Sequence, residues 1–339
     1  DINSAKYVNL SKSWWDQNAN NDLSIGGIMF FTQGEITASN SEATFVIYYN
    51  KGLGEEAKIE DPYKIVKEGK WTIDVLGTLC RAVSEDLNGD DKMDIEDRYG
   101  LYVWDDSILG MLAAAGVKCT SVDETGNLVL SLYSQTSESM FSKYAAIAYD
   151  TQYAICYQRV PNNQLQTRWV NNQALFWATS TVNTKSMREM ETDFGILPYP
   201  KLTEEQSRYY STVAPYNSQF VCIPLIQDDI ERTSAIIETL AYYGQKLVTP
   251  AVYEKTLVGT YFRDDESSEM LNIIMNNYIY DYGYYLQIGT YNSRIMDLLR
   301  TYSYDFTSTY NKYLSQAEKM LTSINKVYET AIERWQTED

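Results

Sequence analysis

The chain has 339 residues, a length that fits two domains at roughly 100–200 residues per domain. Hydrophobic residues make up 44% and charged residues 22%, with 17 glycines and 7 prolines, so the composition disfavours a disordered, collagen-like or low-complexity protein. The 28 basic and 46 acidic residues give a net charge of −18, which would repel phosphate backbones and anionic membranes, so nucleic acid is not an expected partner.

Residues 1–40 are rich in aromatic residues, asparagine and glycine. Residues 14–18 show neither a helical nor a strand period, which predicts an ordered loop. Residues 43–49 form a β-branched and aromatic run that is followed by the turn signal Asn50-Lys51-Gly52. This pattern predicts a buried strand that ends in a turn.

The middle of the chain predicts helices mixed with strands. Apolar residues from Ile73 to Val83 recur every three or four positions, which predicts an amphipathic helix that runs to about Leu87. An acidic loop should follow this helix. The next segments predict a strand at 99–103, a helix at 138–158, a strand at 165–178, and short strands at 194–198 and 220–224 that each end at a proline.

After Pro224 the pattern is mostly helical. It predicts a helix capped by Asp228 or Asp229, a second helix after Ser267 that includes Ile279, and a last helix that includes residues 314–335. Strands mixed with helices, followed by helices alone, indicate an α/β or α+β fold class.

The absence of histidine excludes Ser-His-Asp and Cys-His nucleophile pairs and histidine-ligated zinc. The four cysteines (Cys80, Cys119, Cys156 and Cys222) are widely spaced and are expected to be free, mostly buried thiols, with two disulfides as the alternative. No apolar run is long enough to cross a membrane, and no signal-peptide pattern is present in this chain.

The acidic loop at residues 86–97 has the sequence DLNGDDKMDIED. Its oxygen-bearing residues follow the spacing by which a tight loop wraps a calcium ion. It departs from the EF-hand pattern in the position of its glycine, in its final aspartate, and in being a single loop followed by a strand. A solvated acidic turn is the alternative. The sequence predicts a structural Ca²⁺ site formed by Asp86, Asn88, Asp90, the carbonyl of Lys92, Asp94 and Asp97.

Aromatic residues are abundant, with 30 tyrosines, 9 phenylalanines and 7 tryptophans. Flat rings that stack on sugar rings, beside acidic and amide side chains that bind hydroxyls, are typical of carbohydrate sites. One such group is Trp14, Trp15, Asp16 and Gln17, and another is Trp104, Asp105 and Asp106. The alternative for each group is a core tryptophan beside a capping or turn aspartate.

Several segments resemble the extracellular solute-binding proteins of bacterial ABC importers, in the carbohydrate-binding family that includes maltodextrin-binding proteins. The resemblance covers most of the chain and depends on the order and spacing of short motifs. They are WWDQNA at 14–19, IGG at 25–27, EATFVIYYNK at 42–51, GKWT at 69–72, DRYGL at 97–101, ALFWATST at 174–181 and FGILPYP at 194–200.

The resemblance implies an α/β fold of two lobes joined by crossing strands, with a ligand held between the lobes. Residues 1–44 and 215–289 would form the first lobe, and residues 45–214 and 290–339 the second lobe with the C-terminal helices. The crossing segments would be 43–50 and 211–224. The resemblance also implies that the first lobe lacks its N-terminal strands in this chain, because family members begin with a lipoprotein signal and a segment that builds those strands.

By the same resemblance, the ligand-binding residues would be Trp14, Trp15, Asp16, Glu42, Trp104, Asp105, Trp177, Tyr216 and Asn217. The expected function is capture of a sugar or oligosaccharide for the membrane subunits of an ABC transporter, by a lipoprotein on the cell surface. Two alternatives stay open: a carboxylate-dependent glycoside hydrolase, and a calcium-stabilised adhesion or scaffold protein. Two carboxylates across one site would serve the hydrolase, but no catalytic motif is present, so the chain is not expected to be an enzyme.

Overall fold

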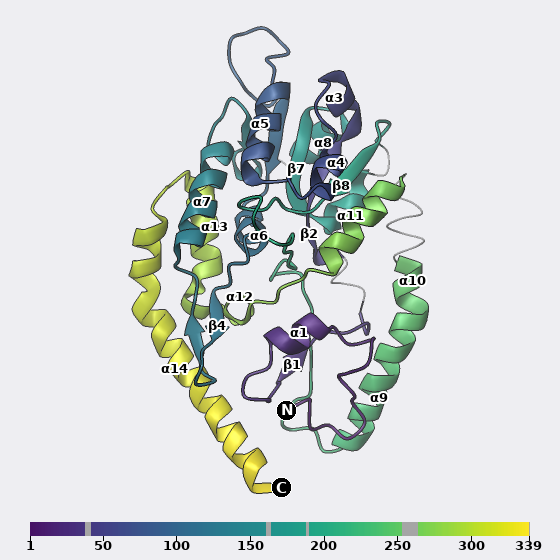
Figure 1. Cartoon of the computed structure of the whole chain (residues 1–339), viewed down its shortest axis with the longest axis vertical. Coiled ribbons are helices and arrows are strands. Elements are labelled where there is room, and N and C mark those ends of the chain that lie inside the picture. Colours follow the sequence, from purple (N-terminus) through teal and green to yellow (C-terminus); the bar gives the residue numbers. More distant parts are fainter. Residues whose placement is uncertain (38–41, 161–163, 188–189, 253–263, 339) are drawn as a thin grey trace.

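The computed structural model describes residues 1–37, 42–160, 164–187, 190–252 and 264–338. A five-stranded sheet lies in the upper half of the molecule (Figure 1). Its strand order is β6 (Ala154–Cys156), β3 (Tyr99–Val103), β7 (Ala174–Ser180), β2 (Phe45–Asn50) and β8 (Phe194–Leu197). Strand β3 is parallel to β6 and β7, whereas β2 is antiparallel to both of its neighbours, β7 and β8.

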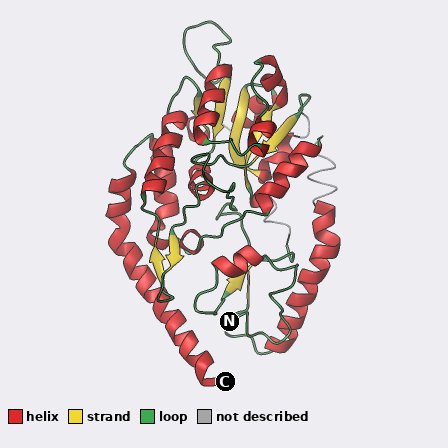
Figure 2. Cartoon of the chain, viewed as in Figure 1, coloured by secondary structure: helices red, strands yellow, loops and turns green. Residues whose placement is uncertain are grey.

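The central strands are mostly apolar, as expected where helices cover both faces of a sheet. Every residue of β2, β3 and β7 is buried. Helix α5 (Ile73–Val83) packs against β3 and β7, while α4 (Pro62–Lys67) and α11 (Asp265–Met275) pack against β8. The further helices around the sheet are α3 (Lys51–Glu56), α6 (Ser107–Ala114), α7 (Gln135–Ala148), α8 (Gln164–Val170) and α13 (Tyr291–Thr301), which are red in Figure 2.

The lower half contains the N-terminal loops and a two-stranded antiparallel sheet (Figure 1). Its elements are α1 (Gln17–Asp22), β1 (Phe31–Thr32), β9 (Val221–Cys222), α9 (Ile230–Tyr243) and α10 (Thr249–Val252). A small hairpin of β4 (Thr120–Val122) and β5 (Leu128–Leu130) and the short α12 (Tyr282–Tyr285) lie beside the long C-terminal α14 (Phe306–Glu338). Short 3₁₀ or π turns connect several of these elements.

Three segments cross side by side between the two halves. Residues 43–44 form an antiparallel bridge with residues 213–214, in which the Ala214 N–H donates to the carbonyl of Ala43 at 2.7 Å. Residue Ser211 in turn pairs with the segment around Tyr278, and the Tyr278 and Thr44 hydroxyls are 2.5 Å apart. The two crossings expected from the resemblance are therefore accompanied by a third, at residues 277–279. Helix α11, which the expected boundary placed in the first lobe, packs on β8 of the second.

The predicted α/β class and two-lobe arrangement are confirmed, and most predicted elements exist with different ends. The helix expected to reach Leu87 ends at Val83. The helix expected at 138–158 ends at Ala148, and residues 154–156 form β6. The strand expected at 165–178 is helical until Val170 because its apolar residues Leu165 and Trp169 have helical spacing and are both buried.

Three other predictions differ in smaller ways. The 14–18 loop gives way to α1 at Gln17, after Asp16, whose carboxylate caps the helix by accepting from the Ala19 N–H. The strand predicted at 220–224 is reduced to Val221–Cys222, and α11 ends at Met275, before Ile279. The expectation for the thiols is confirmed, because all four cysteines are free and only Cys222 is exposed.

Candidate functional site

The carboxyl ends of the parallel strands meet at one edge of the large sheet, where ligands of open α/β sheets characteristically bind. Trp104 follows β3 and Tyr157 follows β6 at this edge. The antiparallel β2 enters the sheet at the same edge, because its first residue, Phe45, pairs with the last residue of β7, Ser180. The edge therefore lies next to the crossing segments between the two halves.

A pocket of about 470 Å³ opens at this edge, and we call it the Trp104 pocket. Its lining residues come from the loops after β3 and β6, from the turn after the second crossing segment, and from α13: Trp104, Asp105, Asp106, Gln158, Tyr216, Ser293, Met296 and Arg300. The Trp104 ring stacks on Tyr157 with centroids 3.8 Å apart and planes inclined by 12°. This contact fixes the orientation of a half-buried tryptophan at the pocket wall.

The deepest charge in the Trp104 pocket is neutralised. Asp105 is only 3% exposed, and its Oδ2 accepts from the Arg300 Nε at 2.5 Å. Arg300 also binds Asp297 at 2.9 Å, one turn earlier on α13. A buried carboxylate requires such a partner because desolvation disfavours an isolated charge. The pair joins the β3–α6 loop to α13 and leaves the guanidinium partly exposed at the pocket.

The neighbouring Asp106 has no arginine or lysine of the described segments at hydrogen-bond distance. Burial, followed by the charge of Asp105, raises the pKa of Asp106 to about 7. Near neutral pH its carboxyl group therefore exchanges between a hydrogen-bond donor and a charged acceptor. Either form can bind a ligand hydroxyl.

This pKa predicts a pH dependence of stability. Between about pH 4 and about pH 7 the folded state keeps a proton on Asp106 that the unfolded state has lost, so this group makes the protein less stable as pH rises. Asp106→Asn removes that contribution. Between about pH 4 and about pH 8, the free energy of unfolding of the variant should rise by roughly 1–3 kcal/mol relative to that of the parent protein. Urea unfolding of both proteins at several pH values measures the difference. Burial also raises the pKa of Asp281, to about 6. Asp281 is present in both proteins, so its contribution cancels in the difference between their free energies of unfolding. Parallel stability profiles would contradict the assignment.

Trp15 and Asp16 line a different, smaller pocket of about 110 Å³, together with Gln33, Tyr278 and Tyr280. Asp16 accepts from the Tyr280 hydroxyl at 2.6 Å and also caps α1. The side chain of Gln33 is buried, and its Oε1 has no hydrogen-bond partner among the residues that the structure describes. The residues expected from the two lobes are thus divided between two pockets beside the crossing segments.

Three predicted ligand residues, Trp14, Glu42 and Asn217, line neither of these two pockets. Trp14 and Trp15 donate from their indole nitrogens to the two carboxylate oxygens of Glu238, at 3.0 and 2.9 Å, and so attach α9 to the N-terminal loop. Glu42 is half-buried just before the first crossing and lines neither pocket, and Asn217 is exposed in the turn after the second crossing.

The prediction for Trp177 is corrected by its burial. Its side chain is 0% exposed and packs between Tyr48 and Trp169, with ring centroids 6.2 and 5.9 Å away. A residue in the middle of a central strand faces a helix layer rather than solvent. Trp177 therefore belongs to the hydrophobic core and lines no cleft in this structure.

Sequence reasoning did not select several residues of the Trp104 pocket. Arg300 lies 195 positions from Asp105, and no local pattern joins the two. Tyr157 and Gln158 follow a three-residue strand that was hidden inside a predicted helix. A signal was present only for Asp106, which directly follows Asp105 in the aromatic and acidic group at 104–106.

The acidic loop at 86–97 is fully described, and its side chains bind its own backbone. Asp86 accepts from the N–H groups of Gly89 and Asp91, and Asp97, which is fully buried, accepts from those of Leu87 and Asp94. Among the residues that the structure describes, no group of three or more acidic or cysteine side chains lies close enough together to hold a metal ion. The oxygen atoms fit the chemistry of calcium, but in this conformation they do not converge.

Within the described ranges, no helix combines the length and the apolar character that a membrane span requires.

Comparisons with known proteins gave matches only among solved structures: no family model and no curated protein matches the sequence. The sugar-binding protein MalE from Xanthomonas citri is similar with a TM-score of 0.65 at 12% identity, over 96% of this chain and 78% of that one. The galacto-N-biose/lacto-N-biose I-binding protein of an ABC transporter from Bifidobacterium longum gives 0.63 at 9% identity, over 95% and 77%. UgpB from Mycobacterium tuberculosis, in complex with glycerophosphocholine, gives 0.60 at 12% identity, over 92% and 75%. The chain therefore has the two-lobe fold of ABC transporter substrate-binding proteins.

Proposed function

We propose that this chain is the substrate-binding component of an ABC importer and that it captures a sugar or oligosaccharide in the Trp104 pocket. The observation that carries the proposal is Trp104 itself, an oriented aromatic ring at the carboxyl edge of the sheet, next to the crossing segments. A sugar offers an apolar face to such a ring and hydroxyls to the side chains around it.

The polar groups of the pocket suit a neutral, hydroxylated ligand. Gln158 and Ser293 offer amide and hydroxyl groups, and Asp105 and Asp106 offer carboxyl oxygens. Arg300 is already paired with two carboxylates, so it is a weak anchor for a phosphate. A net charge of −18 also disfavours an anionic ligand. MalE is a sugar-binding protein, and the protein from Bifidobacterium longum was solved in complex with lacto-N-biose, which supports the same ligand class.

A thermal-shift titration tests the ligand class. A ligand that binds only the native state raises the melting temperature by mass action. Malto-, xylo- and manno-oligosaccharides should be compared with glycerophosphocholine, the ligand bound to UgpB. A rise with one sugar series supports the proposal and identifies the class, whereas a rise with glycerophosphocholine alone contradicts it. Release of reducing ends from polysaccharides would indicate a glycoside hydrolase, and we expect none.

The proposed partners are the membrane subunits of an ABC transporter, and the proposed location is the cell surface, with a lipoprotein anchor. The three adjacent crossing segments support this role, because a few residues between two bodies can act as a hinge that closes them around a ligand. Small-angle scattering with and without the identified sugar should show a decrease in the radius of gyration. A protein partner in pull-down together with no sugar response would favour an adhesion or scaffold protein.

We also propose that the acidic loop at 86–97 binds a structural calcium ion. The support is the donor set, in which Asp86, Asn88, Asp90, Asp94 and Asp97 offer hard oxygens at close spacing. Their present hydrogen bonds to the loop backbone would have to rearrange for these oxygens to converge.

This proposal predicts that calcium raises the melting temperature of the parent protein and that Asp86→Ala combined with Asp90→Ala abolishes the rise. Asp123→Ala is the matched control, because Asp123 also organises an exposed turn, by accepting from Thr125 and Asn127. The control variant should keep the response to calcium. A response that persists in the double variant, or that is missing in the parent protein, would overturn the calcium site.

A further inference from the structure

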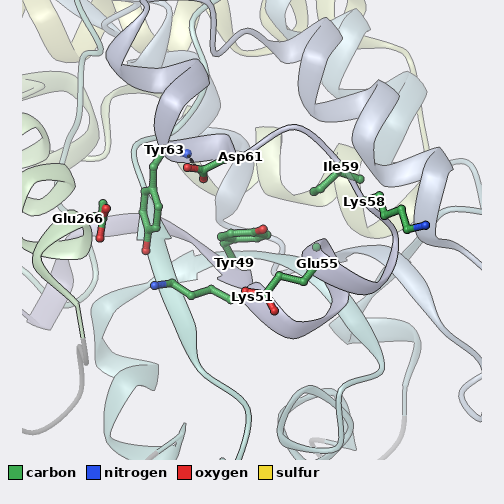
Figure 3. Close-up of a pocket in the computed structure, with 9 residues that line it drawn as sticks. Tyr49, Lys51, Glu55, Lys58, Ile59, Asp61, Tyr63 and Glu266 are labelled. Carbon is green, nitrogen blue, oxygen red and sulfur yellow. Dashed lines mark hydrogen bonds between the residues drawn. The ribbon is translucent and has the colours of Figure 1, made fainter.

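A second concave site lies at the opposite edge of the large sheet. There β2 ends and α3 begins, and Tyr49 pairs with Phe176 and Gly195, near the first residues of β7 and β8. The pocket has a volume of about 280 Å³ and contains the side chains of Tyr49, Lys51, Glu55, Asp61, Tyr63 and Glu266 (Figure 3). We call it the Tyr49 pocket.

Tyr49 is the inner wall of this pocket. The residue is only 6% exposed, yet its hydroxyl makes no hydrogen bond with any part of the chain that the structure describes. The neighbouring backbone is shaped to accommodate this hydroxyl, because a Cβ on Gly54 would come within 2.0 Å of the hydroxyl oxygen. The hydroxyl is accessible from the pocket, so it is available to a ligand that donates to it or accepts from it.

Three carboxylates surround the aromatic wall. Glu55, Asp61 and Glu266 are exposed, and none of them forms an ion pair with a lysine or arginine of the described segments. Glu55 and Asp61 act on the hydroxyl of Tyr49: burial first, and then these two charges, raise the pKa of Tyr49 to about 12.

The lysines nearby form no ion pair with these three carboxylates, although Lys67, which pairs with Glu269, also acts electrostatically on Asp61 and Glu266. Lys51 pairs with Asp264 and lies over the Tyr63 ring, 5.2 Å from its centroid. Lys58 extends away from Tyr49 (Figure 3). The pocket thus combines an aromatic ring, a free hydroxyl and unpaired negative charge.

We propose that the Tyr49 pocket binds the alkylammonium group of a small amine or of a lysine side chain. The ammonium group would donate to the Tyr49 hydroxyl and lie between the carboxylates of Glu55 and Asp61. Cations bind readily to aromatic rings that are combined with acidic groups, and an alkyl chain can cover the remaining ring surface. This site is independent of the Trp104 pocket and of its proposed sugar ligand.

Calorimetric titration with cadaverine at low salt tests the proposal, with pentanol as the neutral control. We expect saturable binding of cadaverine that weakens as ionic strength rises, and no binding of pentanol. N-acetyl-lysine methylamide distinguishes a small free amine from a lysine side chain as the ligand. Binding of this compound in addition to cadaverine supports recognition of a lysine side chain, and binding of cadaverine alone supports a free amine. If neither compound saturates, the proposal is wrong.

Conservative substitutions in the Tyr49 pocket test whether cadaverine binds there. Asp61 caps α4 by accepting from the Tyr63 N–H, and Asp61→Asn keeps a capping side chain while it removes the charge. Asp61→Asn and Glu55→Gln should each weaken cadaverine binding by about threefold, and the double variant by about tenfold. Glu124→Gln removes one negative charge from an exposed turn elsewhere and should leave the affinity unchanged. A double variant with the parental affinity would overturn the assignment.

Discussion

Replacing Trp104 with alanine is expected to weaken oligosaccharide binding by about 30-fold, which corresponds to about 2 kcal/mol. The reason is that the Trp104 ring, held by its stack on Tyr157, is the flat apolar surface of the pocket. Trp104→Phe keeps a smaller ring and should lose only about threefold. Fluorescence or calorimetric titration with the sugar identified by thermal shift measures both variants.

Two controls make the Trp104 experiment specific. Tyr7→Ala removes an aromatic ring that is 47% exposed near the N-terminus, and the sugar affinity should not change. Circular dichroism of Trp104→Ala should show the parental fold, because Trp104 is only half-buried. A folded Trp104→Ala protein with the parental affinity would rule out this pocket as the sugar site.

Replacing Trp177 with alanine is expected to lower the free energy of unfolding by about 4 kcal/mol, because it removes a large side chain from a close-packed core. Trp177 is 0% exposed within β7, beside Tyr48 and Trp169. Its indole N–H has no hydrogen-bond partner in the described part of the chain. Trp177→Phe therefore loses volume without leaving a polar atom unpaired and should cost only about 1.5 kcal/mol. Urea unfolding followed by circular dichroism measures both values.

The phenylalanine variant also separates the core role of Trp177 from the ligand role that the family resemblance implied. Trp177→Phe should bind the sugar with the parental affinity, because the residue lines neither pocket beside the crossing segments. A large loss of affinity in this folded variant, together with a small loss of stability, would instead support the role in the cleft.

The structure confirms the fold that the family resemblance implied, but it does not bring all of the predicted ligand residues together in one site. The order of the motifs indicated the two-lobe α/β fold, and the solved structures of substrate-binding proteins confirm it. The proposed ligand pocket lies near the crossing segments. Which side chains bind the ligand depends on contacts that short motifs do not encode, and the predicted ligand residues are accordingly spread over two pockets, a helix attachment and the core.

The sequence by itself determined the central strands and the main helices, because side-chain periodicity and capping residues are local. The runs at 43–49 and 99–103 predicted strands that the structure has at 45–50 and 99–103, and of the two expected caps, Asp228 or Asp229, the structure has Asp229 at the start of α9. Only the tertiary structure decided the pairing of Asp105 with Arg300, the attachment of Trp14 and Trp15 to Glu238, and the third crossing at 277–279. These contacts join residues that lie far apart in the chain. Their geometry is therefore set by the packing of whole elements, which no local pattern of residues records.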